Sequence, residues 1–265
     1  MIEIPFTKLH GAENDFLLTW AADASTITDL PETARRICSR YTGIGADGWM
    51  LAEPSDNGLQ TRLLNSDGSE AEISGNGTRC AAAFALLRGV TPGPVVTITT
   101  GAGRKQLRLI MRGEKEFLFE MDMGRPEITE LRASLDLNGA NLDATILNVG
   151  NPQCAIFVTE FPENWRDLGR AAESHPRFPN RSNVSFVRPL TPNALEVRFF
   201  ERGAGETRSS GTGSTGAAIA AILRGVAESP VEVKTPAGSL HMKWNGESAS
   251  LTGPAEVIGE GRFFL

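Results

Sequence analysis

The spacing of apolar and polar residues predicts short strands interrupted by a few helices. Residues 95–99 and 231–235 carry alternating β-branched side chains, the period of two that is typical of strands. Similar patterns predict three further strands, at residues 117–121, 155–158 and 195–200. Residues 30–41 and 81–88 are predicted as helices, and the second is rich in alanine and leucine, which favour helix.

The chain contains an internal repeat. Residues 74–90 (SGNGTRCAAAFALLRGV) and 210–226 (SGTGSTGAAIAAILRGV) are identical at ten of seventeen positions, with a constant offset of 136. The same offset relates the two strands predicted after the repeats, so the register is shared across a loop, a helix and a strand. This predicts two copies of one α/β unit, which we place at residues 1–118 and 119–265, with a short C-terminal segment able to return to the first domain.

Each copy has a glycine-rich turn before its helix. The S-G-x-G sequence supplies flexible backbone and leaves N–H groups unpaired, so each helix N-terminus favours negative charge. Gly89 and Gly225 fall where the end of a helix requires a positive φ. The two loops could form separate anion sites. If they instead flank one ligand, they suit inversion at a carbon centre, in which one group removes a proton and the other returns one.

Composition and charge exclude several other classes of protein. The 265 residues are 40% hydrophobic and 22% charged, and 26 basic against 32 acidic side chains give a net charge of −6. No apolar run approaches the roughly 20 residues of a membrane span, and no signal peptide is evident. The absence of a basic cluster argues against nucleic-acid binding. Three widely spaced cysteines fit no metal-ligand pattern and suggest a reducing compartment, so we expect a cytoplasmic protein without a metal.

Five ordered motifs surround the repeats, and through them the sequence resembles the diaminopimelate epimerase family. They are residues 6–16 (FTKLHGAENDF), 43–48 (GIGADG), 65–72 (NSDGSEAE), 150–154 (GNPQC) and 201–207 (ERGAGET). The resemblance implies an α/β fold of the α+β type with two pseudo-symmetric domains. Each domain would be a curved sheet around a central helix, with the active site in the cleft between them. It also implies inversion at the α-carbon of LL- or meso-diaminopimelate, a lysine and peptidoglycan precursor, without pyridoxal phosphate or any other cofactor.

The family's two catalytic cysteines fall on Ser74 and Ser210. A hydroxyl is a far weaker acid than a thiol, whose reference pKa is about 8.5, so a helix N-terminus is not expected to produce an alkoxide base near neutral pH. No activating partner of either serine is evident in the sequence. No motif places His10, His175 or His241 beside both serines, although His10 lies near the ligand end of the first motif. We therefore expect weak or absent epimerisation.

Two native cysteines lie near the motifs but are not expected to replace the bases. Cys80 should face a neighbouring element from within the first helix, and Cys154 should be a small buried residue. Two milder departures from the family are Glu13, where glycine is usual, and Gln153, where histidine is frequent. Either residue could alter the surroundings of the ligand.

The resemblance also implies a set of ligand-binding residues. A zwitterionic amino acid needs acceptors for its ammonium group and donors for its carboxylate. Glu201 and Arg202 correspond to residues that take these two groups at the distal end of the substrate. The reacting carboxylate would be held by the backbone N–H groups that follow the two serines, those of Gly75, Asn76, Gly211 and Thr212. The other side chains that match the family pattern are Asn14, Asn65, Asn151 and Asn183.

Three functions stay open at this point. The first is a diaminopimelate epimerase whose serines are natural or were introduced by substitution. The second is an isomerase, tautomerase or dehydratase of a small amino or dicarboxylic acid on the same fold. The third is a ligand-binding relative without chemistry. In each case the expected partner is a small amino acid or dicarboxylic acid, without nucleic acid or membrane, and exposed sheet edges favour a homodimer.

Overall fold

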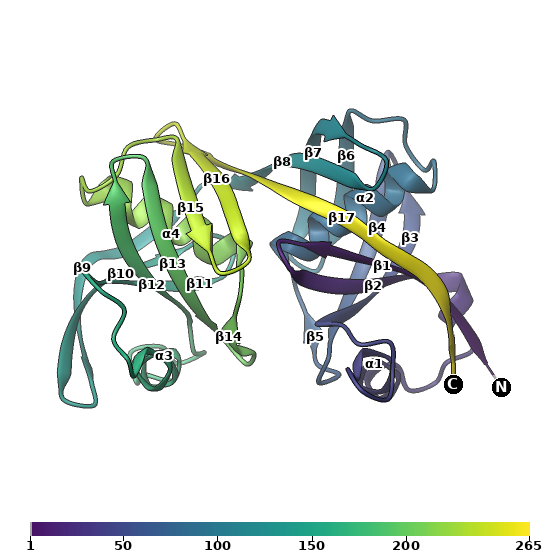
Figure 1. Ribbon diagram of the computed structural model, residues 1–265, viewed down its shortest axis with the longest axis horizontal. Helices are drawn as coiled ribbons and strands as arrows, with labels where there is room; N and C mark the ends of the chain where they lie inside the picture. Colours follow the sequence, from purple (N-terminus) through teal and green to yellow (C-terminus); the bar gives the residue numbers. More distant parts are fainter. Residues whose placement is uncertain (1) are drawn as a thin grey trace. The chain divides into compact units, whose positions relative to one another are not determined.

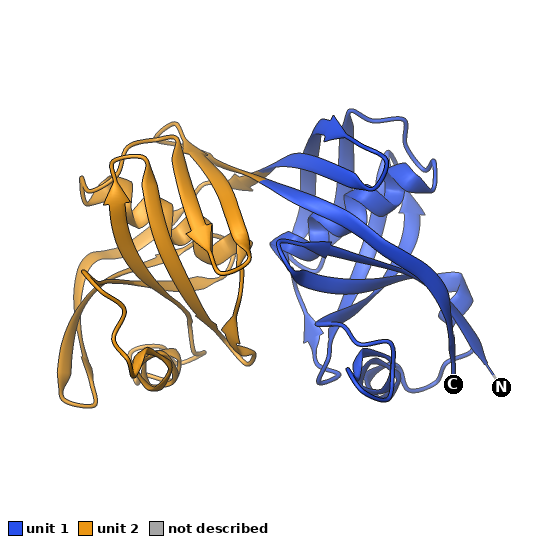
Figure 2. Cartoon of the chain, in the orientation of Figure 1, with its two compact units in different colours: residues 1–121, 253–265 blue, residues 122–252 orange. Residues whose placement is uncertain are grey.

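The chain forms two compact units in a computed structural model that describes residues 2–265. Unit 1 consists of the chain up to Met121 together with Gly253–Leu265, and unit 2 consists of Asp122–Thr252 (Figure 2). Two strands, β8 (Glu116–Gly124) and β17 (Ala249–Phe264), run from one unit into the other. The sequence boundaries of 1–118 and 119–265 differ from these units mainly at the C-terminus. Residues 253–265 lie in unit 1 because β17 pairs antiparallel with β1 (Glu3–Gly11).

Unit 1 is a curved sheet around one central helix (Figure 1). After β1, its strands are β2 (Asn14–Trp20), β3 (Gly48–Ser55), β4 (Gly58–Asn65), β5 (Glu70–Ala71), β6 (Val95–Thr100) and β7 (Gly103–Arg112), followed by β8. Antiparallel hairpins are joined by two parallel pairings, β2 with β3 and β4 with β6. The central helix, α2 (Gly75–Leu87), contacts β1, β2, β4, β6 and β7. Its residues up to Leu86 are all buried, because its alanines allow the sheet to approach closely.

Unit 2 repeats this arrangement. Its strands are β9 (Glu127–Leu137), β10 (Ala140–Asn148), β11 (Pro152–Phe157), β12 (Asn183–Thr191), β13 (Ala194–Glu201), β14 (Gly205–Thr207), β15 (Val231–Thr235) and β16 (Gly238–Trp244). The parallel pairings are β11 with β12 and β13 with β15, equivalent to those of unit 1. The central helix α4 (Gly211–Leu223) contacts β10 to β13, β15 and β16. The mixed α+β fold with two sheet-dominated units confirms the predicted fold class.

Each unit carries a second, more peripheral helix. These are α1 (Leu30–Cys38), which is followed closely by strand β3 in the chain, and α3 (Trp165–Glu173). A 3-10 turn, η1 (Ala21–Ala24), precedes α1. The apolar face of α1 packs into a core that includes Ile37 and Trp49, and α3 packs Trp165 edge-on against Phe186.

The predicted strands are present, but both predicted helices have different ends. The helix expected at residues 81–88 begins earlier, at Gly75, because the Ser74 side chain caps it and S-G-N-G forms its first turn. The helix expected at 30–41 ends at Cys38. The chain then turns back, and the N–H groups of Ile44 and Gly45 both donate to the Ile37 carbonyl. These bonds satisfy the end of α1 and exclude another helical turn. The helix α3 was not predicted.

Gly89 and Gly225 adopt the positive φ expected of them, 67° and 73°. Each follows the C-cap residue of a central helix, Arg88 or Arg224, at the same place in the repeat. No atom of residues 2–265 lies within 4 Å of a Cβ built at either glycine, so backbone conformation rather than space requires glycine there.

Candidate functional site

Both central helices begin at the serines predicted as base positions. Ser74 Oγ accepts a hydrogen bond from the Gly77 N–H at 3.1 Å, and Ser210 Oγ accepts one from the Gly213 N–H at 3.0 Å. A Cβ at Gly213 would lie 2.8 Å from the ring of Phe199, so glycine lets this helix end approach the sheet. Each serine therefore lies at an N-terminus whose first N–H groups could bind an anion.

The two serines differ in their second contact. Ser210 Oγ donates to Glu201 Oε1 at 2.6 Å, and the other oxygen of Glu201 accepts from Thr207 Oγ1 at 2.8 Å. The side chain of Ser74 makes no hydrogen bond to a carboxylate within residues 2–265. The expectation that neither serine has an activating partner is therefore wrong for Ser210. Glu201 lies nine residues away at the end of β13, and only the hairpin of β13 with β14 brings it close.

In unit 2, three further side chains form a chain of hydrogen bonds beside the first turn of α4. Gln153 Nε2 donates to Asn151 Oδ1 at 2.7 Å, and Asn151 Nδ2 donates to Thr212 Oγ1 at 3.3 Å. Gln153 is buried, and its Oε1 has no hydrogen-bond partner in the described part of the chain. These contacts fix the amide of Asn151 with its oxygen occupied and its nitrogen facing the helix N-terminus.

Asn183 and Arg202 are joined through the backbone. Asn183 Oδ1 accepts from the Arg202 N–H at 3.0 Å, and its Nδ2 donates to the Pro152 carbonyl at 3.0 Å. The exposed Arg202 side chain donates to the Asn180 carbonyl at 3.3 Å. Asn183 thus holds the loop that carries Arg202, and the guanidinium is accessible to solvent.

In unit 1, the predicted asparagines make two separate groups. Asn76 Nδ2 donates to Asn14 Oδ1 at 3.2 Å, and Asn14 Nδ2 donates to Asp47 Oδ2 at 2.7 Å. Asn65, at the end of β4, donates to Ser69 Oγ at 3.0 Å within its own turn. Its amide oxygen has no hydrogen-bond partner among the described residues and is available as an acceptor.

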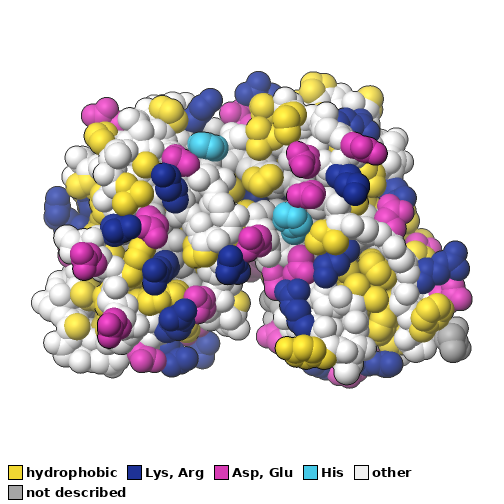
Figure 3. Space-filling view, in the orientation of Figure 1, with side chains coloured by type: hydrophobic (Ala, Val, Ile, Leu, Met, Phe, Trp, Pro, Cys, Tyr) yellow, Lys and Arg dark blue, Asp and Glu magenta, His cyan; other side chains and the backbone are white. Residues whose placement is uncertain are grey.

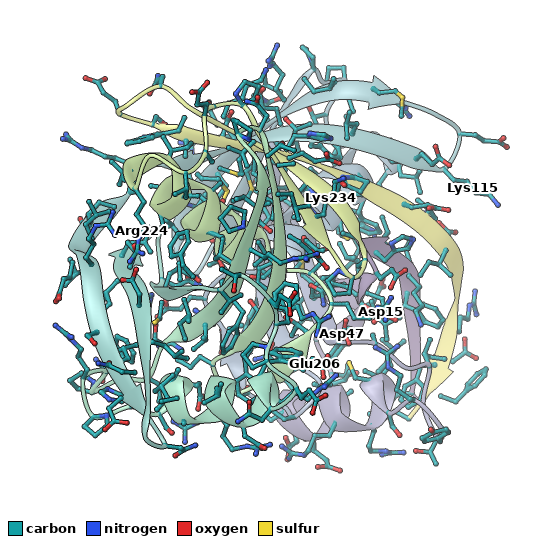
Figure 4. All side chains as sticks on the ribbon, turned by 60° about the vertical axis from the view of Figure 1, so that its left-hand side comes forward. Asp15, Asp47, Lys115, Glu206, Arg224 and Lys234 are labelled. Carbon is teal, nitrogen blue, oxygen red and sulfur yellow. The ribbon has the colours of Figure 1, made fainter. Side chains whose placement is uncertain are left out.

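A cluster of charged side chains contacts Asn14 through Asp47. Arg40 donates to both oxygens of Asp15, at 2.8 and 2.9 Å, and to Asp47 at 2.6 Å, while Lys8 lies 3.0 Å from Asp15. Asp15 and Asp47 are labelled next to one another in Figure 4. Burial opposes the charge of Asp15, but the hydrogen bonds and charges of Arg40 and Lys8 outweigh it and hold the pKa of Asp15 below its ordinary value. Burial raises the pKa of Asp47, and the negative charge of Asp15 adds to this effect.

None of the three histidines contacts either serine within the part of the chain described. His10 Nδ1 accepts from the Glu13 N–H at 3.3 Å, and its Nε2 lies 3.4 Å from Glu256. His175 accepts from the backbone of Arg177, and His241 is exposed on β16. The histidines are thus occupied in local structure or lie at the surface.

The native cysteines are unsuited to act as bases. Cys38, Cys80 and Cys154 are all buried and unpaired by disulfide bonds, and burial raises the pKa of each thiol to about 12. Residues 2–265 contain no cluster of His, Cys, Asp or Glu side chains that could hold a metal ion.

A cavity of about 360 Å³ in unit 1 is separate from this group of residues. Its lining includes Trp20, Phe84 and Arg88 but none of the predicted site residues.

On the faces visible in Figure 3, basic and acidic side chains are interspersed over each unit. No helix within residues 2–265 is long and apolar enough to cross a membrane.

Sequence reasoning missed two kinds of residue at the site. The charged cluster was missed because its members come from separate motifs, and only the parallel pairing of β2 with β3 brings Asp15 and Asp47 together. Arg79 was missed although a signal was present. It is the single charged residue of α2, in a helix otherwise made of small and apolar residues with a few polar ones at its start.

Several solved structures share this fold of two sheet-dominated units. The structure resembles a phenazine biosynthesis protein of the PhzF family from Bacillus anthracis, with a TM-score of 0.75, 16% identity and full coverage of both chains. It also resembles a probable proline racemase from Agrobacterium radiobacter (TM-score 0.74, 17% identity, 97% of this chain and 92% of that one). A third similar structure is a predicted epimerase from Pseudomonas aeruginosa (TM-score 0.73, 17% identity, 99% of each chain).

The sequence is more specific than these structural similarities. The family model for diaminopimelate epimerase matches residues 6–129 and 145–258. The diaminopimelate epimerase of Moorella thermoacetica is 38% identical over 98% of this chain and 99% of its own, and that of Pelotomaculum thermopropionicum is 36% identical over 97% and 98%. The chain belongs to the diaminopimelate epimerase family, which is a family of isomerases.

Proposed function

We propose that this chain binds diaminopimelate or a closely related amino acid and that, with serine at positions 74 and 210, it inverts the α-carbon weakly or not at all. The observation that carries the proposal is a serine at the N-cap of each central helix, where the family resemblance places a catalytic cysteine. The nearly full-length match to curated diaminopimelate epimerases supports the choice of substrate.

The proposed ligand contacts follow from the donors and acceptors available. Backbone N–H groups of Gly75, Asn76, Gly211 and Thr212 would bind the reacting carboxylate, because they are the first N–H groups of α2 and α4. Arg202 would donate to the distal carboxylate. Glu201 was expected to accept from the distal ammonium group, but its hydrogen bond to Ser210 favours a place beside the reacting α-carbon instead. The side chains proposed to complete the set are Asn14, Asn65, Asn151 and Asn183.

Serine chemistry explains the expected loss of activity. Removal of an α-proton needs a base, and a thiolate is accessible near neutral pH where an alkoxide is not. Ser74 Oγ is already an acceptor for the Gly77 N–H, and no carboxylate is hydrogen-bonded to it among the described residues. Proton transfer on the side of Ser74 is therefore expected to be the slower of the two.

A second candidate function follows from the bond between Ser210 and Glu201. A carboxylate is a competent base, and it could take a proton from the ligand directly or through the Ser210 hydroxyl. The hydroxyl would then receive the ligand proton while passing its own to Glu201. Proton transfer would occur at one side only, so the product would be an exchanged or isomerised compound rather than an inverted one.

The test is proton NMR of LL- and meso-diaminopimelate in deuterated buffer, combined with chromatographic separation of the stereoisomers. The protein as written is compared with the Ser74→Cys, Ser210→Cys double variant. Loss of the α-proton signal with inversion in the double variant alone supports the main proposal.

The remaining outcomes separate the alternatives. Exchange without inversion by the protein as written supports one-sided transfer, and its loss in Glu201→Gln identifies the base. Inversion by the protein as written at a rate typical of enzymes contradicts the argument from serine. If neither protein exchanges the α-proton and calorimetry detects no binding, diaminopimelate is not the ligand.

A further inference from the structure

Arg79 is a charged side chain buried inside unit 1 without an ionic partner. It is 0% exposed, and none of the ion pairs among residues 2–265 includes it. Its three hydrogen bonds go to neutral acceptors. Nε donates to the Pro254 carbonyl at 2.9 Å, Nη1 to the Gly75 carbonyl at 3.3 Å and Nη2 to Asn76 Oδ1 at 2.6 Å. The guanidinium therefore lies between the first turn of α2 and strand β17.

Burial of the Arg79 guanidinium costs hydration free energy, and the fold leaves a space that fits this group. A buried cation without an anion loses hydration that neutral acceptors replace only in part. Burial lowers the pKa of Arg79 to about 10, so the group is still a cation at neutral pH. A Cβ at Gly11 would lie 3.2 Å from Arg79 Nη2 and also 3.2 Å from the Pro254 carbonyl oxygen, so glycine in β1 leaves the space that the guanidinium fills.

The guanidinium begins a chain of hydrogen bonds with a fixed direction. Arg79 can only donate, so it occupies Asn76 Oδ1, and Asn76 Nδ2 must then donate to Asn14 Oδ1 at 3.2 Å. Asn14 Nδ2 donates to Asp47 Oδ2 at 2.7 Å, and this carboxylate also accepts from Arg40. A cation fixes one end of this chain of hydrogen bonds and a carboxylate fixes the other. Both asparagine amides therefore have an acceptor oxygen that is already hydrogen-bonded and a second N–H that is still available to donate.

We propose that Arg79 is a positioning residue that sets Asn76 and Asn14 as hydrogen-bond donors, so that this part of unit 1 binds a carboxylate and not an ammonium group. A bound carboxylate would also supply negative charge close to an otherwise uncompensated cation. The inference rests on the proposed function only in taking an amino acid as the source of that carboxylate. The guanidinium itself acts through Asn76 and does not contact the ligand.

Unit 2 lacks this device. The offset of 136 relates Arg79 to Thr215, whose hydroxyl donates to the Gly211 carbonyl within α4 at 2.8 Å. The arginine is therefore not required to build the central helix of this fold. Its presence in one copy alone points to a role in what that copy binds.

The first experiment needs no ligand. Side-chain amide signals of Asn76 and Asn14 are recorded in ¹⁵N–¹H spectra of the protein as written, of Arg79→Met and of Arg79→Lys. Arg79→Met should shift both amide pairs, and Arg79→Lys should shift them less because it keeps a cationic donor. The matched control is Arg224→Met, which removes a nearly buried arginine at the C-cap of α4 and should leave both signals in place. Unchanged amide signals in Arg79→Met would overturn the proposal.

The second experiment measures the affinity for meso-diaminopimelate by calorimetry. Arg79→Met should weaken binding by about tenfold or more, as expected for losing a charge-assisted hydrogen bond, and Arg224→Met should not weaken it. In an Asn76→Ala background, Arg79→Met should have almost no further effect, because the arginine acts through that amide. Equal effects in both backgrounds would refute this route.

Two safeguards keep the test decisive. If Arg79→Met does not fold, Asn76→Asp replaces it. That variant gives Arg79 a carboxylate partner, so it should be at least as stable as the unmodified protein while binding the ligand at least tenfold more weakly. Unchanged affinity in Asn76→Asp would contradict the donor role. If the unmodified protein does not bind diaminopimelate, the proposed function fails, while the amide signals still decide the role of Arg79.

Discussion

Cysteines placed at the two N-cap positions should ionise at different pH values. In Ser74→Cys, the thiol would meet the N–H groups at the start of α2, which stabilise a thiolate. In Ser210→Cys, it would meet an equivalent helix end and also Glu201, whose carboxylate oxygen lies 2.6 Å from Ser210 Oγ. A carboxylate at this distance accepts a hydrogen bond from a thiol and repels a thiolate, so it raises the thiol pKa.

Coulomb's law gives the size of this difference. Two unit charges about 4 Å apart repel by about 4 kcal/mol at an effective dielectric constant of ~20, which corresponds to roughly three pKa units. Glu201 is half-buried, and solvent reduces the repulsion. We therefore expect the thiol of Ser210→Cys to titrate about one to two units above that of Ser74→Cys.

The assay is the pH dependence of iodoacetamide alkylation in each single variant, followed by mass spectrometry. The buried native thiols serve as an internal control, since a pKa of about 12 leaves only about one thiol in ten thousand ionised at pH 8. Adding Glu201→Gln to Ser210→Cys should move its titration toward that of Ser74→Cys. Coincident titrations of the two single variants, or an inverted order, would refute the reasoning.

Three stability predictions can be checked by urea denaturation. Asp15→Asn should cost about 2 kcal/mol, because Lys8 loses its carboxylate partner and the half-exposed Arg40 keeps only Asp47. The pKa of Asp15 is lowered in the folded state. Its contribution to folding stability is therefore present above the unfolded-state pKa near 4 and is lost as the pH falls through the folded-state pKa. Asp15→Asn lacks this contribution, so its stability should fall less on acidification than that of the unmodified protein. Gly43→Ala should cost at least about 3 kcal/mol, because its Cβ would lie 2.2 Å from a carbonyl oxygen of α1. Gly89→Ala should cost about 1–2 kcal/mol, because the described residues leave space for its Cβ and only the φ of 67° is unfavourable. Equal losses of stability in the two variants would contradict the steric argument. Ser74→Ala should cost about 1 kcal/mol as a lost N-cap, and Ser210→Ala should cost more because it also removes a bond to a carboxylate; the reverse order would count against that bond.

The sequence predicted those parts of the fold that depend on local chemistry or on the repeat. The strand at 231–235 has the predicted ends because its alternation and its bounding turns are local signals. The end of α1 could not be predicted, since it depends on a returning loop whose N–H groups reach Ile37. The same limit applies to the site. The bond from Arg79 to Pro254 joins residues separated by 175 positions, and no spacing rule indicates such a pair.

Duplication gave the two units equivalent backbones, and their differences now lie in charge. The offset of 136 relates Asn65 to Glu201, so a neutral acceptor stands in unit 1 where unit 2 has a carboxylate hydrogen-bonded to its capping serine. The same offset relates Arg79 to Thr215, so a buried cation stands in unit 1 where unit 2 has a hydroxyl. Both differences make the surroundings of the central helix N-terminus more favourable to negative charge in unit 1 than in unit 2. The two helix N-termini are therefore equivalent in backbone but differ in the charge around them, and this asymmetry does not depend on whether sulfur or oxygen occupies the capping positions.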